Sequence, residues 1–260
     1  MMTAYINELV YLTIILCISA SVIYFLSNGN SGREIIARIL AITALLVSSL
    51  ALIARTLLVD RLPLANGAEY MLWFGWFTIL TYLFFEIWSK NRGAGGMVML
   101  FSALLVGTIP LLMPHQLGDL SNLMPALKSP WLTSHVLTAV VAYGCFAVAA
   151  GIAAMYLWKG SMKSDIWISR IVGIGFVFLT ITIVLGAIWA EQAWGRYWSW
   201  DPKETWALVT WIVYAIYFHL QRQKAWQGKK GNILVVGGFI LVLFTFFGVN
   251  FLLSGLHSYA

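Results

Sequence analysis

Long apolar runs alternate with short polar segments along the whole chain, and each run is the length of one membrane-crossing helix. A hydrocarbon core about 30 Å thick needs roughly 20 apolar residues per helix. The expected spans are residues 5–26, 34–58, 68–88, 96–113, 130–158, 166–190, 206–222 and 232–254. The pattern predicts an all-α, polytopic membrane protein with eight transmembrane helices, organised as a single integral-membrane domain over residues 1–260.

Composition agrees with this pattern and excludes several classes of protein. The chain is 61% hydrophobic and only 10% charged, whereas a soluble domain carries about a quarter charged residues. The two cysteines, Cys17 and Cys145, lie in apolar runs and form no CxxC or CxxCH motif, so neither a zinc ribbon nor covalent haem attachment is indicated. No base precedes the first apolar run, and we therefore expect that run to remain as an anchor.

The lysines and arginines are spread over short loops and helix ends, which is typical of topology signals and not of a nucleic-acid surface. The odd-numbered loops hold eleven bases: Arg33, Arg38, Lys90, Arg92, Lys159, Lys163, Arg170, Arg222, Lys224, Lys229 and Lys230. The even-numbered loops hold five: Arg55, Arg61, Lys128, Arg196 and Lys203. The positive-inside rule then predicts cytoplasmic odd loops and two extracytoplasmic termini.

Four ionisable residues near expected helix ends have no assigned chemistry. These residues are Arg55, Arg61, Glu69 and Glu86. Contact with haem, with a partner protein or with lipid is open for each, and the simplest interpretation is an interfacial charge at the membrane surface, where water solvates it.

Tryptophan is unusually dense in the sixth loop, which reads "WGRYWSWDPKETW" over residues 194–206. The tryptophans of this region are Trp189, Trp194, Trp198, Trp200 and Trp206. An interfacial aromatic belt explains one or two of them. Five beside several charges favour an extracytoplasmic platform over residues 189–206 for a large flat ligand with an acidic edge. Haem fits this description, with Arg196 or Lys203 pairing its propionates; a quinone head or a lipid is an alternative.

The residues "DPKE" predict the start of the seventh helix. Asp201 suits the N-cap, Pro202 suits the first helical position, and Glu204 stands where a capping-box acid reaches back. The tryptophan segment should therefore end in a defined helix start.

Two histidines flank the tryptophan loop and share its expected side of the membrane. His135 lies near the start of the fifth span and His257 lies just beyond the eighth. Two neutral imidazoles make a six-coordinate haem site, although a histidine at a helix end is also common as a hydrogen-bonded interfacial residue. His219 follows Asp201 by 18 residues, about 27 Å along a straight helix, so it cannot ligate the same iron. An ionisable residue at membrane depth is a functional candidate, and a snorkelling or capped residue near the interface is the alternative. His115 is expected to be an ordinary loop residue.

The segment "WGRYWSWDPKETWAL", with a histidine on each side, resembles the tryptophan-rich WWD signature of haem-handling proteins. Its "DPKETWAL" continuation is similar to that of the CcsA/ResC family of System II cytochrome c biogenesis, within the superfamily that includes CcmC and CcmF. The segment "PLANGAEYMLWFGW", residues 63–76, also resembles this family. The resemblance is specific over residues 189–206, and the eight spans, the outward loop and the positions of His135, His219 and His257 support it.

This resemblance implies a role and a set of partners. Haem b would be received at an inner site with His219 as ligand, passed outward and presented on the platform with His135 and His257 as axial ligands. The platform would comprise Trp189, Trp194, Trp198, Trp200, Asp201 and Trp206. The partners would be a CcsB/ResB-like membrane protein that supplies the second inner ligand, an apocytochrome c with a CxxCH peptide, and, indirectly, thiol-reducing proteins. The location would be a bacterial plasma membrane or a thylakoid membrane.

Three alternatives differ in function. A haem transporter or chaperone of the CcmC type would carry the same platform and ligands without synthase activity. An electron-transferring b-type cytochrome would need paired histidines within the membrane, whereas His219 is alone at that depth. A solute transporter would be indicated by inverted repeats and broken helices, which the sequence does not display.

Overall fold

The computed structural model describes residues 2–121, 123–160 and 165–253, and all regular structure in these ranges is helical. The polytopic all-α expectation is therefore confirmed for the described chain. The helices form two compact units, residues 1–121 and 122–260, and the single integral-membrane domain expected from the sequence stays a prediction. An irregular connection follows the fourth helix, and the helices on each side of it pack into a set of their own.

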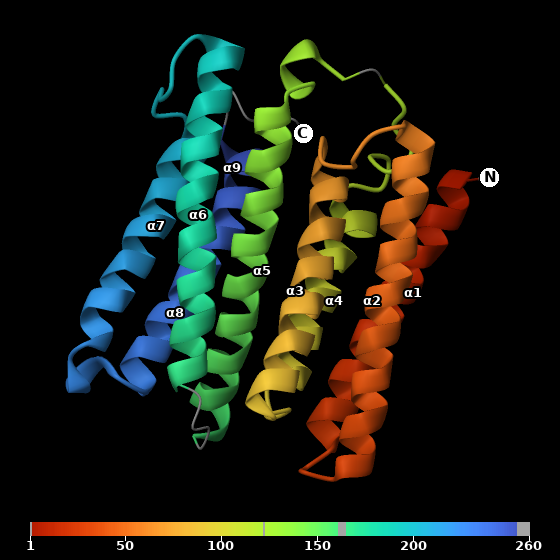
Figure 1. The fold of residues 1–260 in the computed structure, drawn as a ribbon. Helices are drawn as coiled ribbons and strands as arrows, with labels where there is room; N and C mark the ends of the chain where they lie inside the picture. The colour runs from red at the N-terminus through yellow and green to blue at the C-terminus, as the bar shows by residue number, and fades with distance from the viewer. Residues whose placement is uncertain (1, 122, 161–164, 254–260) are drawn as a thin grey trace. The chain divides into compact units, whose positions relative to one another are not determined.

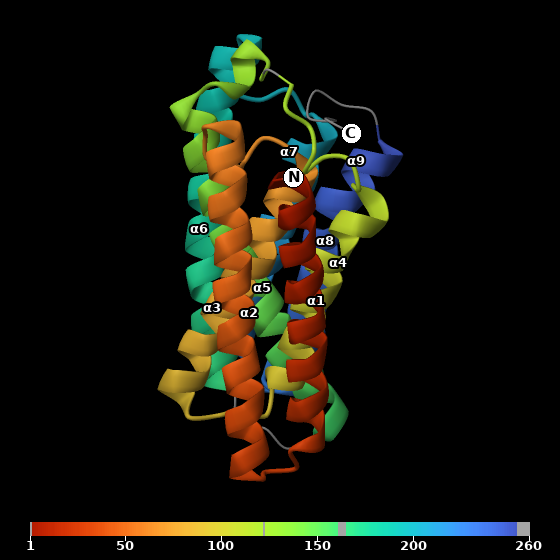
Figure 2. The ribbon, with the colours of Figure 1, turned by 90° about the vertical axis from the view of Figure 1, so that its right-hand side faces the viewer.

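The first unit contains four long helices: α1 (Met2–Leu26), α2 (Ser31–Val59), α3 (Gly67–Ser89) and α4 (Gly95–Leu112). They run up and down in turn, and α1 packs against both α2 and α4 while α3 closes the set against α2 and α4 (Figures 1 and 2). Glycines permit the closest approaches, because Gly75 of α3 lies against Val106 of α4 and leaves no room for a Cβ atom. Small residues let membrane helices approach in this way.

The second unit is also built from four long helices: α5 (Pro130–Lys159), α6 (Asp165–Trp194), α7 (Pro202–Gln221) and α8 (Lys229–Leu243). Helix α8 continues through a π-helical turn at Phe244–Gly248 into α9 (Val249–Leu252). Two short 3-10 turns, Pro125–Leu127 and Lys224–Trp226, precede α5 and α8. Contacts run from α5 to α6, α6 to α7, α7 to α8 and α8 to α5, which makes a closed bundle.

A stack of two aromatic rings fills the centre of the second unit. Phe146 of α5 and Tyr214 of α7 lie almost parallel, with ring centroids 3.9 Å apart and an interplanar angle of 6°. Gly175 of α6 faces Phe146, and Gly238 of α8 faces Tyr214, so a glycine lies on each outer side of the stack. Residues from all four helices of this bundle are therefore in close contact around the Phe146–Tyr214 stack.

Among the described residues, seven helices are long and apolar enough to cross a membrane by length and composition. They are Met2–Leu26, Ser31–Val59, Gly67–Ser89, Gly95–Leu112, Pro130–Lys159, Ile166–Trp194 and Lys229–Leu252. The seventh expected span, residues 206–222, is present as the 20-residue helix α7, but its composition keeps it out of this group. The chain is accordingly a multi-pass membrane protein. That α7 also crosses the membrane stays a prediction.

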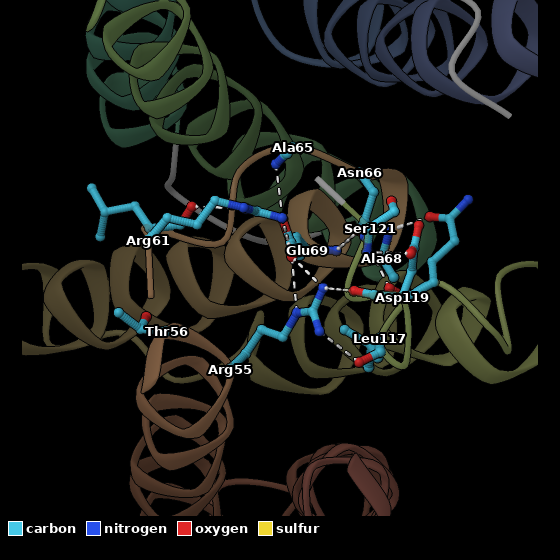
Figure 3. A network of polar contacts seen from close by, with 12 residues as sticks. Arg55, Thr56, Arg61, Ala65, Asn66, Ala68, Glu69, Leu117, Asp119 and Ser121 are labelled. Carbon is cyan, nitrogen blue, oxygen red and sulfur yellow. Dashed lines mark hydrogen bonds and ion pairs between the residues drawn. The ribbon is translucent and has the colours of Figure 1, made fainter. Parts of the chain in front are cut away.

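The expectation of solvated interfacial charges was wrong for Arg55 and Glu69, whose side chains are 0% exposed. Figure 3 shows Arg55 of α2 donating to Glu69 of α3, with Nε and the Glu69 Oε1 atom 2.9 Å apart. The other guanidinium nitrogens of Arg55 donate to the carbonyls of Leu117 and Asp119. A charge is costly to bury without partners. The Arg55 guanidinium, the Glu69 carboxylate and the two carbonyls are therefore expected to become buried in the same folding step.

The carboxylate of Glu69 is fully used within this network (Figure 3). It accepts from both terminal nitrogens of Arg61, at 2.9 and 3.1 Å, and from the backbone N–H of Ala65. The Glu69 carboxylate thus binds the loop between α2 and α3 directly, and through Arg55 it is linked to the segment that follows α4. Nearby, the backbone N–H of Ser121 donates to Asp119, which lowers the pKa of that exposed carboxyl.

Glu86, at the far end of α3, was also expected to be interfacial and is instead 3% exposed. Its carboxylate accepts from the hydroxyl of Tyr24 at 2.6 Å and lies 3.4 Å from Arg38 and 3.2 Å from Arg92. The first unit therefore carries one buried carboxylate near each end of α3. Sequence pattern alone could not separate these from surface charges, because their partners lie on other helices.

Candidate functional site

The tryptophan segment lies at the end of the second unit where α6 ends and α5 and α7 begin (Figure 1). The closed bundle brings together side chains that are far apart in the sequence. His135 comes from the second turn of α5, Trp189 and Trp194 from the end of α6, and Lys203 from the start of α7. The fold thus places the loop and one of the two flanking histidines on the same unit and at the same end.

His135 is held by a hydrogen bond to the backbone of the neighbouring helix. Its Nδ1 atom lies 2.8 Å from the carbonyl oxygen of Thr182 on α6. A carbonyl only accepts, so Nδ1 is the protonated nitrogen and the lone pair of the neutral ring is on Nε2. This tautomer is the one needed for an Nε2 ligand to a metal, and an outer hydrogen bond of this kind is usual for metal-binding histidines.

Gly186, one turn beyond Thr182, lies directly beneath the His135 ring. A Cβ atom at this position would be 2.8 Å from both Cε1 and Nδ1 of the ring. Neither Thr182 nor Gly186 was identified from the sequence. Every residue has a backbone carbonyl, so the sequence does not mark the one that accepts a hydrogen bond. The available signal was a glycine inside an apolar helix, which often marks a close approach.

The three remaining histidines differ in how the structure places them. His257, the second expected axial ligand, lies outside the described residues, so its position relative to His135 stays a prediction. His219 is exposed near the C-terminal end of α7, on the same helix as Asp201 and at its opposite end. His115 is exposed in the segment after α4, as expected for a loop residue.

The five tryptophans do not form a single flat layer. Trp189 and Trp194 meet edge to face with centroids 6.1 Å apart, and Trp198 and Trp200 do so at 5.8 Å. Trp206 packs edge to face on Phe244 at 4.5 Å. Edge-to-face pairs present both ring faces and ring edges to a ligand. The tryptophan rings of this segment therefore lie at steep angles to one another and not in one plane.

Exposure separates these tryptophans into a structural and an available group. Trp189 is 1% exposed, and its Nε1 donates to the carbonyl of Ala126 at 2.9 Å, just before α5 begins. Trp200 is 69% exposed, and Trp194 and Trp198 are partly buried. Trp189 is therefore a buried support of the loop, whereas Trp194, Trp198 and Trp200 remain able to touch a ligand. Trp206 is partly buried and packs on Phe244.

Trp194 has a buried hydrogen-bond donor that could bond to an acceptor on a ligand. Its Nε1 atom is buried and has no hydrogen-bond partner among the described residues. Leaving an N–H group buried without an acceptor costs about 1–3 kcal/mol. A carboxylate of a bound ligand would satisfy it, and so the donor set fits a flat molecule with acidic groups, such as haem.

The backbone of the loop is defined by two left-handed residues and a helix cap. Gly195 (φ +73°) ends α6, and Trp200 has a φ of 59°, which is unusual for a bulky side chain. The predicted capping box is confirmed: Asp201 accepts from the backbone of Lys203, and the Glu204 side chain accepts from the Asp201 N–H at 3.2 Å. Asp201 itself is 6% exposed, which gives it a clear structural role in the loop.

The two bases expected to meet propionates lie in different surroundings. Arg196 is exposed on the loop. Lys203 points into the bundle, where its Nζ donates to Oδ1 of Asn250 on α9 at 2.8 Å and lies 5.8 Å from the ring centroid of Phe246. Arg196 is therefore the better candidate to pair with an acidic ligand edge.

Within the described ranges, no group of three or more His, Cys, Asp or Glu side chains could hold a metal ion. Haem does not need such a group, because the porphyrin supplies four nitrogens and the protein only the axial ligands. One correctly oriented histidine per haem face is enough.

Comparison with known proteins identifies the family. The model of the family described as "Cytochrome C assembly protein" matches residues 64–257. The cytochrome c biogenesis protein CcsA of Trieres chinensis is 33% identical to this chain, and the match covers 92% of each protein. The CcsA protein of Chlamydomonas reinhardtii is 38% identical over 76% of this chain, which spans 60% of that relative. The CcsA protein of Prochlorococcus marinus is 31% identical over 86% of this chain.

A solved structure shares the fold. The cytochrome c heme lyase CcmF superposes with a TM-score of 0.77 over 95% of this chain and 47% of its own, at 17% sequence identity. Given the family match over residues 64–257 and the relatives that align along most of their length, the chain belongs to the cytochrome c assembly protein family, in the branch of the CcsA proteins of cytochrome c biogenesis.

Proposed function

We propose that this protein is the haem-handling subunit of a cytochrome c synthase. In this role it accepts haem b as a substrate and presents it on the tryptophan segment 194–206 for attachment to an apocytochrome c. Family membership supports a role in cytochrome c maturation. The observation that carries the haem assignment is His135, because its Nδ1 is bonded to a carbonyl at the loop end of the bundle and its Nε2 carries the lone pair.

The chain's own residues would hold haem from its faces and its edge. Trp194, Trp198 and Trp200 would pack against the porphyrin, and the Trp194 N–H and Arg196 would meet a propionate. His135 would bind one face of the iron and His257 the other, which gives a six-coordinate, low-spin centre. Trp189, Asp201 and Lys203 would shape the loop without touching the ligand.

The attachment reaction adds each cysteine S–H of a CxxCH peptide across a haem vinyl group. A C–S bond forms at one vinyl carbon, the proton is transferred to the other, and no group leaves. No side chain of the described segment is an obvious acid or base for this step. We therefore propose catalysis by positioning, with the thiols kept reduced by other proteins and the cytochrome's own histidine displacing one axial ligand at release.

Haem delivery and the partner complete the proposal. The exposed His219, at the opposite end of α7, would receive haem on the cytoplasmic side together with a ligand from a CcsB/ResB-like protein. The tryptophan segment and both termini would face the extracytoplasmic side of a bacterial plasma membrane or the lumenal side of a thylakoid membrane. The alternative is a haem chaperone without synthase activity, since the same site would serve it.

Haem spectra of the purified protein, prepared with and without a ResB-like partner, test this function. Wild type, His135→Ala, His257→Ala and His219→Ala form the series. Loss of low-spin haem in the first two variants, with recovery on adding imidazole, is the expected result. Identical haem content in all four proteins would remove the histidine assignment. Co-expression with a CxxCH substrate separates the two functions, because only a synthase yields covalently bound haem.

A further inference from the structure

We propose that Gly186 and the backbone carbonyl of Thr182 together position the His135 ring, so that helix α6 orients the axial ligand. This inference rests on the proposed function, because it concerns how a haem ligand of that function is held. His135 and the two α6 residues belong to the same unit, and the ring contacts both of them.

The geometry of an α-helix explains why a glycine is needed here. In a helix the N–H of residue 186 donates to the carbonyl of residue 182, and that oxygen keeps a second lone pair. Side chains of a helix tilt toward its N-terminus, so a side chain at position 186 would cover the turn that holds Thr182. Glycine leaves this carbonyl accessible, and His135 uses it from the neighbouring helix at 2.8 Å.

Steric contact makes the arrangement sensitive to one methyl group. A Cβ atom at position 186 would lie 2.8 Å from Cε1 and from Nδ1, closer than real Cβ contacts allow. Either the ring or helix α6 would have to shift. Glycine weakens a helix relative to alanine, which indicates that this position serves a contact and not helix stability.

The nature of the acceptor matters for the chemistry. A neutral carbonyl orients the ring and selects its tautomer, whereas a carboxylate would also raise the basicity of the imidazole. The carbonyl of Thr182 thus orients the ligand without itself placing a negative charge beside it. This suits a site that must release haem to a product, unlike one that binds its haem permanently.

The first test compares two identical substitutions on helix α6, made in the full chain co-expressed with its ResB-like partner. Gly186→Ala places a methyl group against the His135 ring, whereas the Cβ atom of Gly173→Ala has its nearest neighbour, Phe218, at an ordinary 3.8 Å. We expect Gly186→Ala to lower the low-spin haem fraction severalfold, with recovery on adding imidazole. Gly173→Ala should keep the wild-type spectrum. Equal spectra for the two variants would overturn the proposal.

A second measurement keeps the proposal testable if Gly186→Ala is poorly folded. The thermal midpoint of haem-free protein is measured for Gly186→Ala, His135→Ala and the double variant. If the added methyl group acts through the ring, Gly186→Ala lowers the midpoint in the wild-type background and has little effect once His135 is alanine. An equal decrease in both backgrounds would contradict the proposed contact.

The two failures can be told apart. If His135→Ala leaves the haem spectrum unchanged, the axial-ligand assignment of the proposed function fails, whatever the stability data show. If His135→Ala loses low-spin haem but Gly186→Ala does not, the proposed function stands and the positioning role of Gly186 is wrong.

Discussion

The ammonium group of Lys203 donates to the amide oxygen of Asn250 across 2.8 Å, which ties the first turn of α7 to helix α9. This contact turns Lys203 toward the bundle, while Arg196, seven residues earlier, remains exposed on the tryptophan loop. The two bases of the segment therefore have different roles, although the sequence presents them as equivalent candidates for a propionate.

Substituting these two bases should separate ligand binding from stability. Arg196→Gln should weaken haem retention severalfold without changing the thermal midpoint, because its side chain is exposed. Lys203→Met should lower stability by about 1–2 kcal/mol through the loss of the bond to Asn250. Haem titration and thermal unfolding of each variant check this. Unaltered haem binding in Arg196→Gln would exclude its contact with the propionate.

The tryptophans should divide in the same way. Trp189→Phe removes the N–H that bonds Ala126 in a buried position, so it should destabilise the protein by about 1–3 kcal/mol. Trp200→Gly should leave stability unchanged or raise it, since the left-handed backbone of Trp200 suits glycine. Haem affinity should nevertheless decrease in Trp200→Gly. Thermal midpoints and haem affinities of both variants are the measurement, and the opposite ordering of stability would refute the division.

Asp201 can be tested as a helix cap separately from its charge. Asp201→Ser keeps a side-chain oxygen for the backbone of α7, whereas Asp201→Ala removes it and should cost about 0.5–2 kcal/mol. If Asp201 serves the site only by shaping the loop, Asp201→Ser binds haem as wild type does. A haem spectrum lost in the serine variant, with stability retained, would instead assign the carboxylate a direct part in the site.

The buried network around Glu69 predicts a large effect outside the haem site. Glu69→Gln leaves the fully buried Arg55 without its carboxylate and should destabilise the first unit by about 3–5 kcal/mol. The matched control is Glu8→Gln on α1, where the side chain is exposed and the same change should have little effect. Limited proteolysis and thermal unfolding report the difference. Similar stability in both variants would show that the ion pair contributes little.

Much of this protein is determined by its sequence alone. Long apolar runs force helix formation, because a backbone in lipid must satisfy its own hydrogen bonds, and all eight expected helices are present. The residues "DPKE" specify a helix start by purely local chemistry, and the capping box forms as expected. The tryptophan segment and its flanking histidines were also recognisable, since their residue types carry the chemistry.

The tertiary structure decided everything that depends on which helices are neighbours. Spacing could not reveal that Trp189 is buried against Ala126, that Lys203 bonds Asn250, or that Arg55 and Glu69 form a buried pair. The support of His135 was beyond the sequence for a further reason, because its partners are a backbone carbonyl and the missing side chain of Gly186. Every residue has a backbone carbonyl, so the sequence cannot show which one His135 will bond to. The packing of α5 against α6 decides this, because it brings the Thr182 carbonyl within reach of the ring.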